Sequence, residues 1–199
     1  MEIFQSNQKV EINFCYNGWM ILGHSELKKL LKSDNLVTNL AERELKDPEG
    51  CVFDLRIEKI YSLKGKAFLG IEERETPDLV EKASYDPKKK STFVFMPGKY
   101  YLTKTIEEVN LPDNIAVLFK PRGTTYRSGL VIRTGIANPG YHGPLYFGAI
   151  NEGPVPVEIE MGSRYVQCFF LEVKGKPVHS YRGQWQGGRA STKGREKQI

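Results

Sequence analysis

The sequence has few of the residues that build cross-links and metal centres. Its 199 residues include three cysteines and three histidines. The cysteines, at positions 15, 51 and 168, lie far apart and contain no Cys-x-x-Cys pair. They form no disulfide framework, so reduced thiols in a cytoplasm are the simpler interpretation. The histidines are scattered and contain no His-Glu-x-x-His motif, which argues against a zinc site and against zinc-dependent deaminase chemistry.

Long apolar runs and the common nucleotide loops are also missing. No segment approaches the roughly 18–20 apolar residues that span a bilayer. The N-terminus is not a basic stretch followed by an apolar one, so no secretory signal is visible. Walker A, Gly-x-Gly-x-x-Gly and Gly-x-Ser-x-Gly motifs are absent. We therefore expect a cytoplasmic protein without a membrane partner.

Positive charge is concentrated at the C-terminus. The formal net charge is +5, and residues 182–199 contribute five basic side chains against Glu196, a local +4, which leaves about +1 for the remainder. A nucleic-acid interface normally involves the folded surface or interleaved aromatic residues. We expect no nucleic-acid partner and interpret residues 181–199 as a flexible basic arm, with a frayed end as the alternative.

The body of the chain has the composition of one soluble domain, with 40% hydrophobic and 27% charged residues. The spacing of Leu27, Leu30 and Leu31 predicts a short amphipathic helix over residues 24–32, with Ser25 as its N-cap. Residues 1–19 form an extension in which a loose alternation between residues 10 and 16 suits one strand. The charged stretch 72–90 is interpreted as a solvated loop.

Short strands punctuated by glycine and proline turns dominate the rest. We predict strands at 52–57, 60–63, 92–96, 100–103, 115–119, 129–132, 145–147, 155–159 and 165–173. Many short strands with one N-terminal helix favour a mainly β fold, a distorted β-barrel or jelly roll.

Two segments have the composition of a ligand site. In residues 121–128, Arg122 and Arg127 flank a glycine and two threonines, so a turn at a strand end would direct hydroxyls, backbone N–H groups and guanidinium groups at one anion. In residues 135–143, three glycines and a proline surround Tyr141, which suggests a tight hairpin where a ligand approaches the backbone and the aromatic ring packs beneath a sugar. An exposed charged turn and a plain hairpin are the alternatives.

Taken in order, these pieces resemble the motif series of the dUTPase / dCTP deaminase family, whose members act on pyrimidine deoxynucleoside triphosphates. Residues 49–56 resemble the first motif, with Asp54 at its aspartate. Arg122 and Arg127 match the arginines of an Arg-Ser-Ser-x-x-Arg motif in which Gly123 and Thr124 replace the serines. Residues 135–143 resemble the nucleoside-binding hairpin, 162–167 a Gly-x-x-x-x-Gln motif, and 181–187 the tail of archaeal-type dUTPases.

The resemblance implies a dUTPase-like barrel over residues 20–180, assembled as a homotrimer with active sites between subunits. It also implies a bound dUTP or dCTP with Mg²⁺ on the phosphates, and an arm that closes over the site. Asp54 would hold a metal-bound water, and Asp54, Asn138 and Arg127 would take part in catalysis. The nucleotide-binding residues would be Arg122, Gly123, Thr124, Thr125, Gly135, Ile136, Tyr141, Gln167, Tyr181, Arg182, Trp185 and Gln186.

Two positions depart from the family pattern. Asn138 stands where dUTPases have the aspartate that activates water, and an amide orients water but does not take its proton near neutral pH. Gly148 stands where dCTP deaminases have a proton-shuttling glutamate, and Glu152 lies four residues further on. Three hypotheses follow: a dUTP diphosphatase, a dCTP deaminase, and a catalytically silent nucleotide-binding or regulatory protein. A generic β-structured interaction protein leaves the ordered motifs unexplained.

Overall fold

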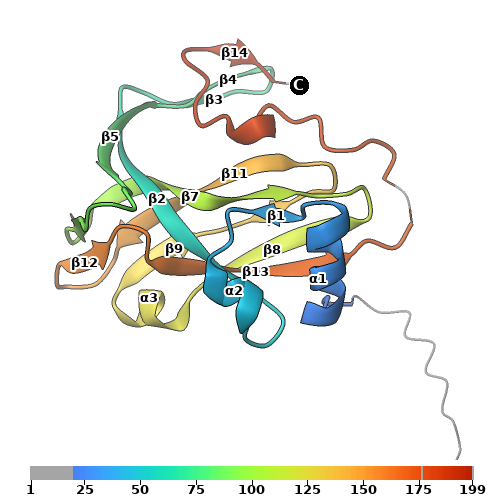
Figure 1. Ribbon diagram of the computed structural model, residues 1–199. Helices are drawn as coiled ribbons and strands as arrows, with labels where there is room; N and C mark the ends of the chain where they lie inside the picture. Colours follow the sequence, from blue (N-terminus) through green and yellow to red (C-terminus); the bar gives the residue numbers. More distant parts are fainter. Residues whose placement is uncertain (1–19, 176, 199) are drawn as a thin grey trace, which may run out of the picture.

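A computed structural model describes residues 20–175 and 177–198 (Figure 1). The strand expected between residues 10 and 16, and Cys15, lie outside them. The helical elements are α1 (His24–Ser33), α2 (Glu42–Lys46), α3 (Gly123–Arg127) and the 3-10 turn η1 (Gln186–Gly188). The strands are β1 (Val37–Thr38), β2 (Phe53–Lys64), β3 (Phe68–Leu69), β4 (Glu73–Glu75), β5 (Asp78–Ser84), β6 (Thr92–Phe95), β7 (Tyr100–Asn110), β8 (Ile115–Pro121), β9 (Leu130–Arg133), β10 (Ile136–Ala137), β11 (His142–Asn151), β12 (Val157–Glu160), β13 (Arg164–Glu172) and β14 (Glu196–Lys197).

The main sheet has the order β10-β8-β13-β2-β7-β11-β9, with β1 added to β7 and β5 added to β2. Long β2 joins its two halves: residues 53–56 pair with β13, and residues 57–64 pair with β7 and β5. Register shifts after Ile57 and Ile60 interrupt these ladders, and such irregularities bend a strand. The sheet curls into a half-barrel, which confirms the predicted mainly β, distorted-barrel class.

The inner face of the curl forms one apolar core. Along β7, buried Thr103, Thr105, Glu107 and Val109 alternate with more exposed neighbours, as the two-residue period of a half-buried strand requires. The two threonine hydroxyls are satisfied within the sheet: Thr103 donates to Phe147 O (2.9 Å) and Thr105 to Glu107 O (2.7 Å). The core is therefore fixed by paired polar groups as well as by apolar contact.

The predicted N-terminal helix is present as α1. Leu27 is fully buried, and Leu30 and Leu31 pack against the core, so the predicted apolar face is correct. The predicted cap is wrong: Gly23 precedes the helix and Ser25 lies inside it, so Gly23 O, not a serine hydroxyl, accepts from the Glu26 and Leu27 amides. Among the described residues, no helix is long and apolar enough to cross a membrane.

Three other expectations need correction. The stretch 72–90 is not a loop throughout, since it contains β4 and β5, and β5 extends the sheet at β2. Residues 135–143 are not a β-hairpin, because β10 pairs with β8 whereas β11 pairs with β7 and β9. The segments 52–57 and 60–63, predicted as two strands, form the single strand β2.

Candidate functional site

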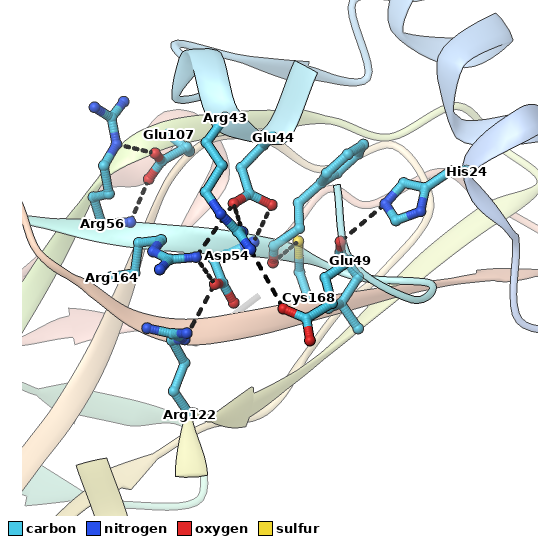
Figure 2. A network of polar contacts seen from close by, with 12 residues as sticks. His24, Arg43, Glu44, Glu49, Asp54, Arg56, Glu107, Arg122, Arg164 and Cys168 are labelled. Carbon is cyan, nitrogen blue, oxygen red and sulfur yellow. Dashed lines mark hydrogen bonds and ion pairs between the residues drawn. The ribbon is translucent and has the colours of Figure 1, made fainter. Parts of the chain in front are cut away.

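Asp54 lies at the centre of a buried ion-pair cluster (Figure 2). Its Oδ2 accepts from Arg164 Nη1 at 2.7 Å and lies 3.1 Å from Arg122 Nε. Its side chain is 6% exposed, whereas the Arg122 and Arg164 side chains are 27% and 29% exposed. One face of each guanidinium group is therefore fixed by the carboxylate, while part of each group still reaches the surface.

Helix α2 completes this cluster with Glu44, a buried carboxylate that the sequence did not single out. Glu44 Oε2 accepts from the Asp54 amide at 3.1 Å, and Oε1 lies 3.0 Å from Arg43 Nη1 and 3.7 Å from Arg164 Nη1. Buried Asp54 and Glu44, together with Glu49, which lies 3.3 Å from Arg43 Nη2, thus balance three arginines, so the cluster is charge-compensated.

Three of the residues predicted to bind phosphates, Arg122, Thr125 and Gln167, lie on or beside the strands that carry this cluster. Arg122 caps α3, and its amide donates to Tyr165 O (3.0 Å). The Thr125 hydroxyl also donates to Tyr165 O (3.2 Å), and Gln167 pairs in register with Asp54. The Arg127 guanidinium lies 5.7 Å from the Tyr126 ring centroid. Figure 2 shows Arg122 reaching towards Asp54 from the chain that leads into α3.

The residues predicted to bind the nucleoside line a different place, a cavity of about 460 Å³. Its walls are mostly aliphatic and aromatic, as small-molecule sites usually are. Among the described residues that line it, none is an aspartate or a glutamate. From the predicted set it contains Gly135, Ile136, Asn138, Tyr141, Tyr181 and Trp185.

The turn between β10 and β11 forms one wall of this cavity. The Tyr141 amide donates to Asn138 O (3.1 Å), and Gly140 has φ +83°, a conformation that disfavours other residues. The Tyr141 hydroxyl donates to Pro144 O (2.6 Å), and burial raises its pKa. Tyr141 therefore lines the site as a neutral ring whose hydroxyl is already used, while exposed Asn138 leads into the opening.

The C-terminal arm, residues 181–198, ends beside the β3–β4 hairpin (Figure 1). Its residues Tyr181, Trp185, Arg189 and Ala190 line the cavity. Tyr181 packs edge-on against Tyr141, with ring centroids 5.5 Å apart. Gln186 ties the arm to the turn: its Oε1 accepts from the His142 amide (3.1 Å) and its Nε2 donates to Gly140 O (2.8 Å). Arg182 lies outside this cavity, near a shallower depression that Asn138 also lines.

The outer part of the arm is held by the β3–β4 hairpin. The Arg74 guanidinium lies 4.5 Å from the Trp185 ring centroid and 2.8 Å from Glu196 Oε1. Thr76 and Thr192 exchange two hydrogen bonds, amide to hydroxyl in both directions, each 2.9 Å. Arg189 and then Arg74 lower the pKa of Glu196, because each guanidinium favours the carboxylate form.

In one chain, the two groups of predicted residues are not brought together. None of the residues from Asp54, α3 or Gln167 lines the cavity. The structure also adds residues that sequence patterns did not reveal, because their partners are distant in the chain: Arg164 and Glu44 in the cluster, Arg74 under the arm, and Tyr100, Leu102 and Arg133 in the cavity.

A magnesium ion would find a single candidate carboxylate beside the predicted phosphate-binding residues. No group of three or more His, Cys, Asp or Glu side chains suited to a metal occurs within residues 20–175 and 177–198. Asp54 Oδ2 is taken by arginines, and Oδ1 is buried without a hydrogen-bond partner. That orphaned oxygen fits one water-mediated contact and no more, so phosphate oxygens and waters would have to supply the other ligands.

Comparison with known proteins identifies the family to which this chain belongs. Residues 21–173 match the family model described as dCTP deaminase-like, so the chain belongs to the dCTP deaminase-like family. A probable deoxyuridine 5'-triphosphate nucleotidohydrolase of Methanothermobacter thermautotrophicus is 30% identical over 167 residues, covering 84% of this chain and 99% of the relative. A dCTP deaminase of Pyrococcus furiosus is 29% identical over 157 residues, covering 79% and 88% of the two chains.

A solved structure supports the fold. The 2'-deoxycytidine 5'-triphosphate deaminase of Agrobacterium tumefaciens superposes with a TM-score of 0.61 at 19% identity. The match covers 77% of this chain and 48% of that one, so this chain spans about half the length of the deaminase. The curled sheet is therefore the shared element.

Proposed function

We propose that this protein binds a pyrimidine deoxynucleoside triphosphate and hydrolyses dUTP to dUMP and pyrophosphate. The observation that carries the proposal is the apolar cavity between the 138–141 turn and the arm, which is formed by the residues expected to hold a nucleoside. Its volume of about 460 Å³ lies within the range of small-molecule sites. Relatives named as a deoxyuridine triphosphate nucleotidohydrolase support the choice of reaction.

The phosphate chain would be held by the residues around α3. Arg122 is oriented by Asp54 and still partly exposed, so its outward face is prepared for a phosphate without further ordering. Thr124, Thr125, Arg127 and Gln167 would add hydroxyl, guanidinium and amide donors. A bound Mg²⁺ would neutralise charge on the phosphates, with Asp54 Oδ1 as its one carboxylate contact.

A homotrimer would unite the two groups of residues. One chain places the phosphate residues and the cavity apart, so a complete site would need α3 of one subunit near the cavity of another. This assembly leads to a complementation test. Arg122→Ala chains and Trp185→Ala chains, each inactive alone, should regain activity when mixed and refolded together. Sedimentation showing only monomer at micromolar concentration would count heavily against the trimer.

Hydrolysis requires water to attack the α-phosphate and lose a proton. Asn138 lines the cavity and can orient that water, but the cavity has no carboxylate among its described lining residues. Loss of a general base typically costs about 10²–10⁴ in rate. We therefore propose a slow hydrolase in which Asn138 positions water and the arginines stabilise charge on the phosphates.

The lack of a carboxylate among the described residues that line the cavity also favours a second candidate, a catalytically silent nucleotide-binding or regulatory protein. A deaminase is the weaker alternative, because Gly148 has no side chain and Glu152 lies at the surface, 3.0 Å from Arg133. Incubation with dUTP or dCTP and Mg²⁺, followed by separation of the products, distinguishes the three. Pyrophosphate indicates the hydrolase, ammonia the deaminase, and intact but bound nucleotide the silent binder.

Asn138→Asp tests the missing base directly. We expect the aspartate to raise the rate of pyrophosphate release from dUTP by about 10²–10⁴, because it restores a proton acceptor beside the water. The matched control is Asn114→Asp, which makes the same change at an exposed residue outside the cavity lining and should leave the rate of pyrophosphate release unaltered. A wild-type rate already comparable to that of the Asn138→Asp variant would overturn the assignment of Asn138.

A further inference from the structure

Tyr100 covers Gly148. A Cβ atom at Gly148 would lie 2.8 Å from Tyr100 Cζ and closer still to its hydroxyl oxygen, too close for a real contact. The two residues belong to the paired strands β7 and β11, in which Tyr100 faces Ile150 and Gly148 faces Leu102. Tyr100 lines the cavity, whereas buried Gly148 is not part of the lining. The tyrosine therefore occupies the space into which a side chain at position 148 would grow.

Tyr100 brings a hydroxyl group to a mostly apolar cavity, whose other polar lining residues include Asn138, Arg133 and Arg189. Leu102, Phe147 and Leu79 line the same cavity. No hydrogen bond from this hydroxyl to another described residue is present, in contrast to the Tyr141 hydroxyl, which donates to Pro144 O. Tyr100 is 44% exposed and lines the cavity, so a ligand there can reach it. A few unpaired polar groups in an apolar pocket are what orient a bound small molecule.

We propose that Tyr100 is a ligand-contacting, specificity-determining residue: its hydroxyl hydrogen-bonds the polar edge of the pyrimidine base, and its ring occupies the space over Gly148. This inference rests on the proposed function, because it takes the cavity as the nucleoside pocket. A phenol both donates and accepts a hydrogen bond, whereas a carboxylate only accepts. The base is thus held by a group that can pair with either a donor or an acceptor on its edge.

The first test is Tyr100→Phe, which removes the hydroxyl and keeps the ring. Calorimetry should show a roughly 5–10-fold weaker affinity for dUTP, the loss of one hydrogen bond. Binding of inorganic triphosphate should not change, since it has no base. The melting temperature should also stay unchanged, because the hydroxyl makes no hydrogen bond to another described residue. Tyr101→Phe is the matched control: Tyr101 lies on the opposite face of β7, packed at 5.0 Å against Phe93, and should leave dUTP affinity unaltered.

The outcomes separate the two proposals. If wild type binds no pyrimidine nucleotide, the proposed function fails and the role of Tyr100 fails with it. If wild type binds dUTP and Tyr100→Phe binds it equally well, the inference alone is wrong. If Tyr100→Phe weakens dUTP and inorganic triphosphate alike, the hydroxyl does not contact the base and the inference is likewise wrong.

The second test concerns the space over Gly148. Gly148→Ala should lower the melting temperature in the wild-type background, because the Tyr100 ring must then shift, and much less when Tyr100 is also changed to Ala. Gly148→Glu alone should release no ammonia from dCTP. Equal destabilisation by Gly148→Ala in both backgrounds would show that Tyr100 does not fill this space.

Discussion

The Asp54 cluster and the C-terminal arm both depend on arginine–carboxylate pairs, yet the two regions are built differently. In the cluster, both carboxylates are almost completely buried and lie on or against the central strands β2 and β13. In the arm, the Glu196 side chain is 23% exposed, and Glu196 lies on β14, which pairs with β4 in a separate three-stranded sheet. The first pairing is therefore part of the global fold, and the second is a contact that can open locally.

This difference indicates how each region can serve a ligand. The cluster holds its arginines ready before anything binds, so its contribution is preorganisation. The arm must separate from the cavity if a ligand enters beneath it, and its contacts are those of a reversible closure. The predictions below test this contrast, from the largest expected effect to the smallest.

Asp54→Asn should have the largest effect on stability. It leaves Arg122 and Arg164 without their shared carboxylate in a mostly buried place, at a cost of about 2–3 kcal/mol once the partial exposure of the arginines is allowed for. Thermal and urea unfolding measure this loss. Glu152→Gln is the control, because it breaks the exposed pair with Arg133 and should change stability by less than about 0.5 kcal/mol. Equal effects would mean that the cluster is no more integral than a surface pair.

Arg74→Met should release the arm without unfolding the sheet. It removes the stacking on Trp185 and the pair with Glu196, together worth about 1–2 kcal/mol, so the open population should rise roughly tenfold. Limited proteolysis with thermolysin, followed by mass spectrometry, reports cleavage within residues 181–198. Lys197→Met removes one charge from an exposed position of the arm and should leave the cleavage rate unaltered. Equally slow cleavage in the wild type and both variants would contradict the role of Arg74 in holding the arm.

Acid should open the arm. Arg189 and Arg74 lower the pKa of Glu196 below its ordinary value of 4.5, so the docked state binds its proton less readily than the released state. The contribution of Glu196 to docking is therefore complete above pH 4.5 and is lost as the pH falls through the lowered pKa. Trp185 fluorescence, followed in a Trp19→Phe background, should change in that window, and Glu196→Gln should abolish the transition.

The smallest effect is expected for the labelling of Cys168, because this thiol lies in the sheet next to the cluster and should stay protected when the arm opens. Its thiol is fully buried and donates to Phe53 O at 3.3 Å, and burial raises its pKa, so the thiolate is disfavoured. Iodoacetamide should label half-buried Cys51 in the native protein and Cys168 only on unfolding. Labelling of Cys168 under conditions that release only the arm would contradict the separation of the two regions.

Local patterns predicted the parts of the fold in which burial follows sequence period. The apolar run of β13 and the leucine face of α1 each depend on neighbours within a few residues, so these elements were predictable. Of β7 only residues 100–103 were predicted, although the strand extends to Asn110. The stretch 72–90 was misjudged because β5 lies at a sheet edge, where most of its side chains are exposed and its strand pairing depends on the backbone. Charged composition is compatible with such a strand.

The sequence predicted the residues of the site in two groups, but not how these groups are arranged in space. Spacing and resemblance gave Arg122, the 135–143 segment and the aromatic residues of the arm, but not which of them lie together. Those relations depend on distant pairs, such as Thr76 with Thr192, 116 residues apart, and Arg74 with Glu196, 122 apart. No periodicity links such positions, so Arg74 and Tyr100 gained their roles only from the three-dimensional arrangement.

The close approach of β11 and the arm has a consequence for how this chain tolerates change. A Cβ at Gly143 would lie 2.8 Å from the Gly187 carbonyl carbon, and one at Gly188 would meet the ring of Pro144. At these two glycines the arm therefore lies in direct contact with β11, in addition to the hydrogen bonds made by Gln186. Replacement of either glycine would push the two segments apart, because Gly143 faces peptide backbone and Gly188 faces a rigid proline ring, neither of which can rotate away.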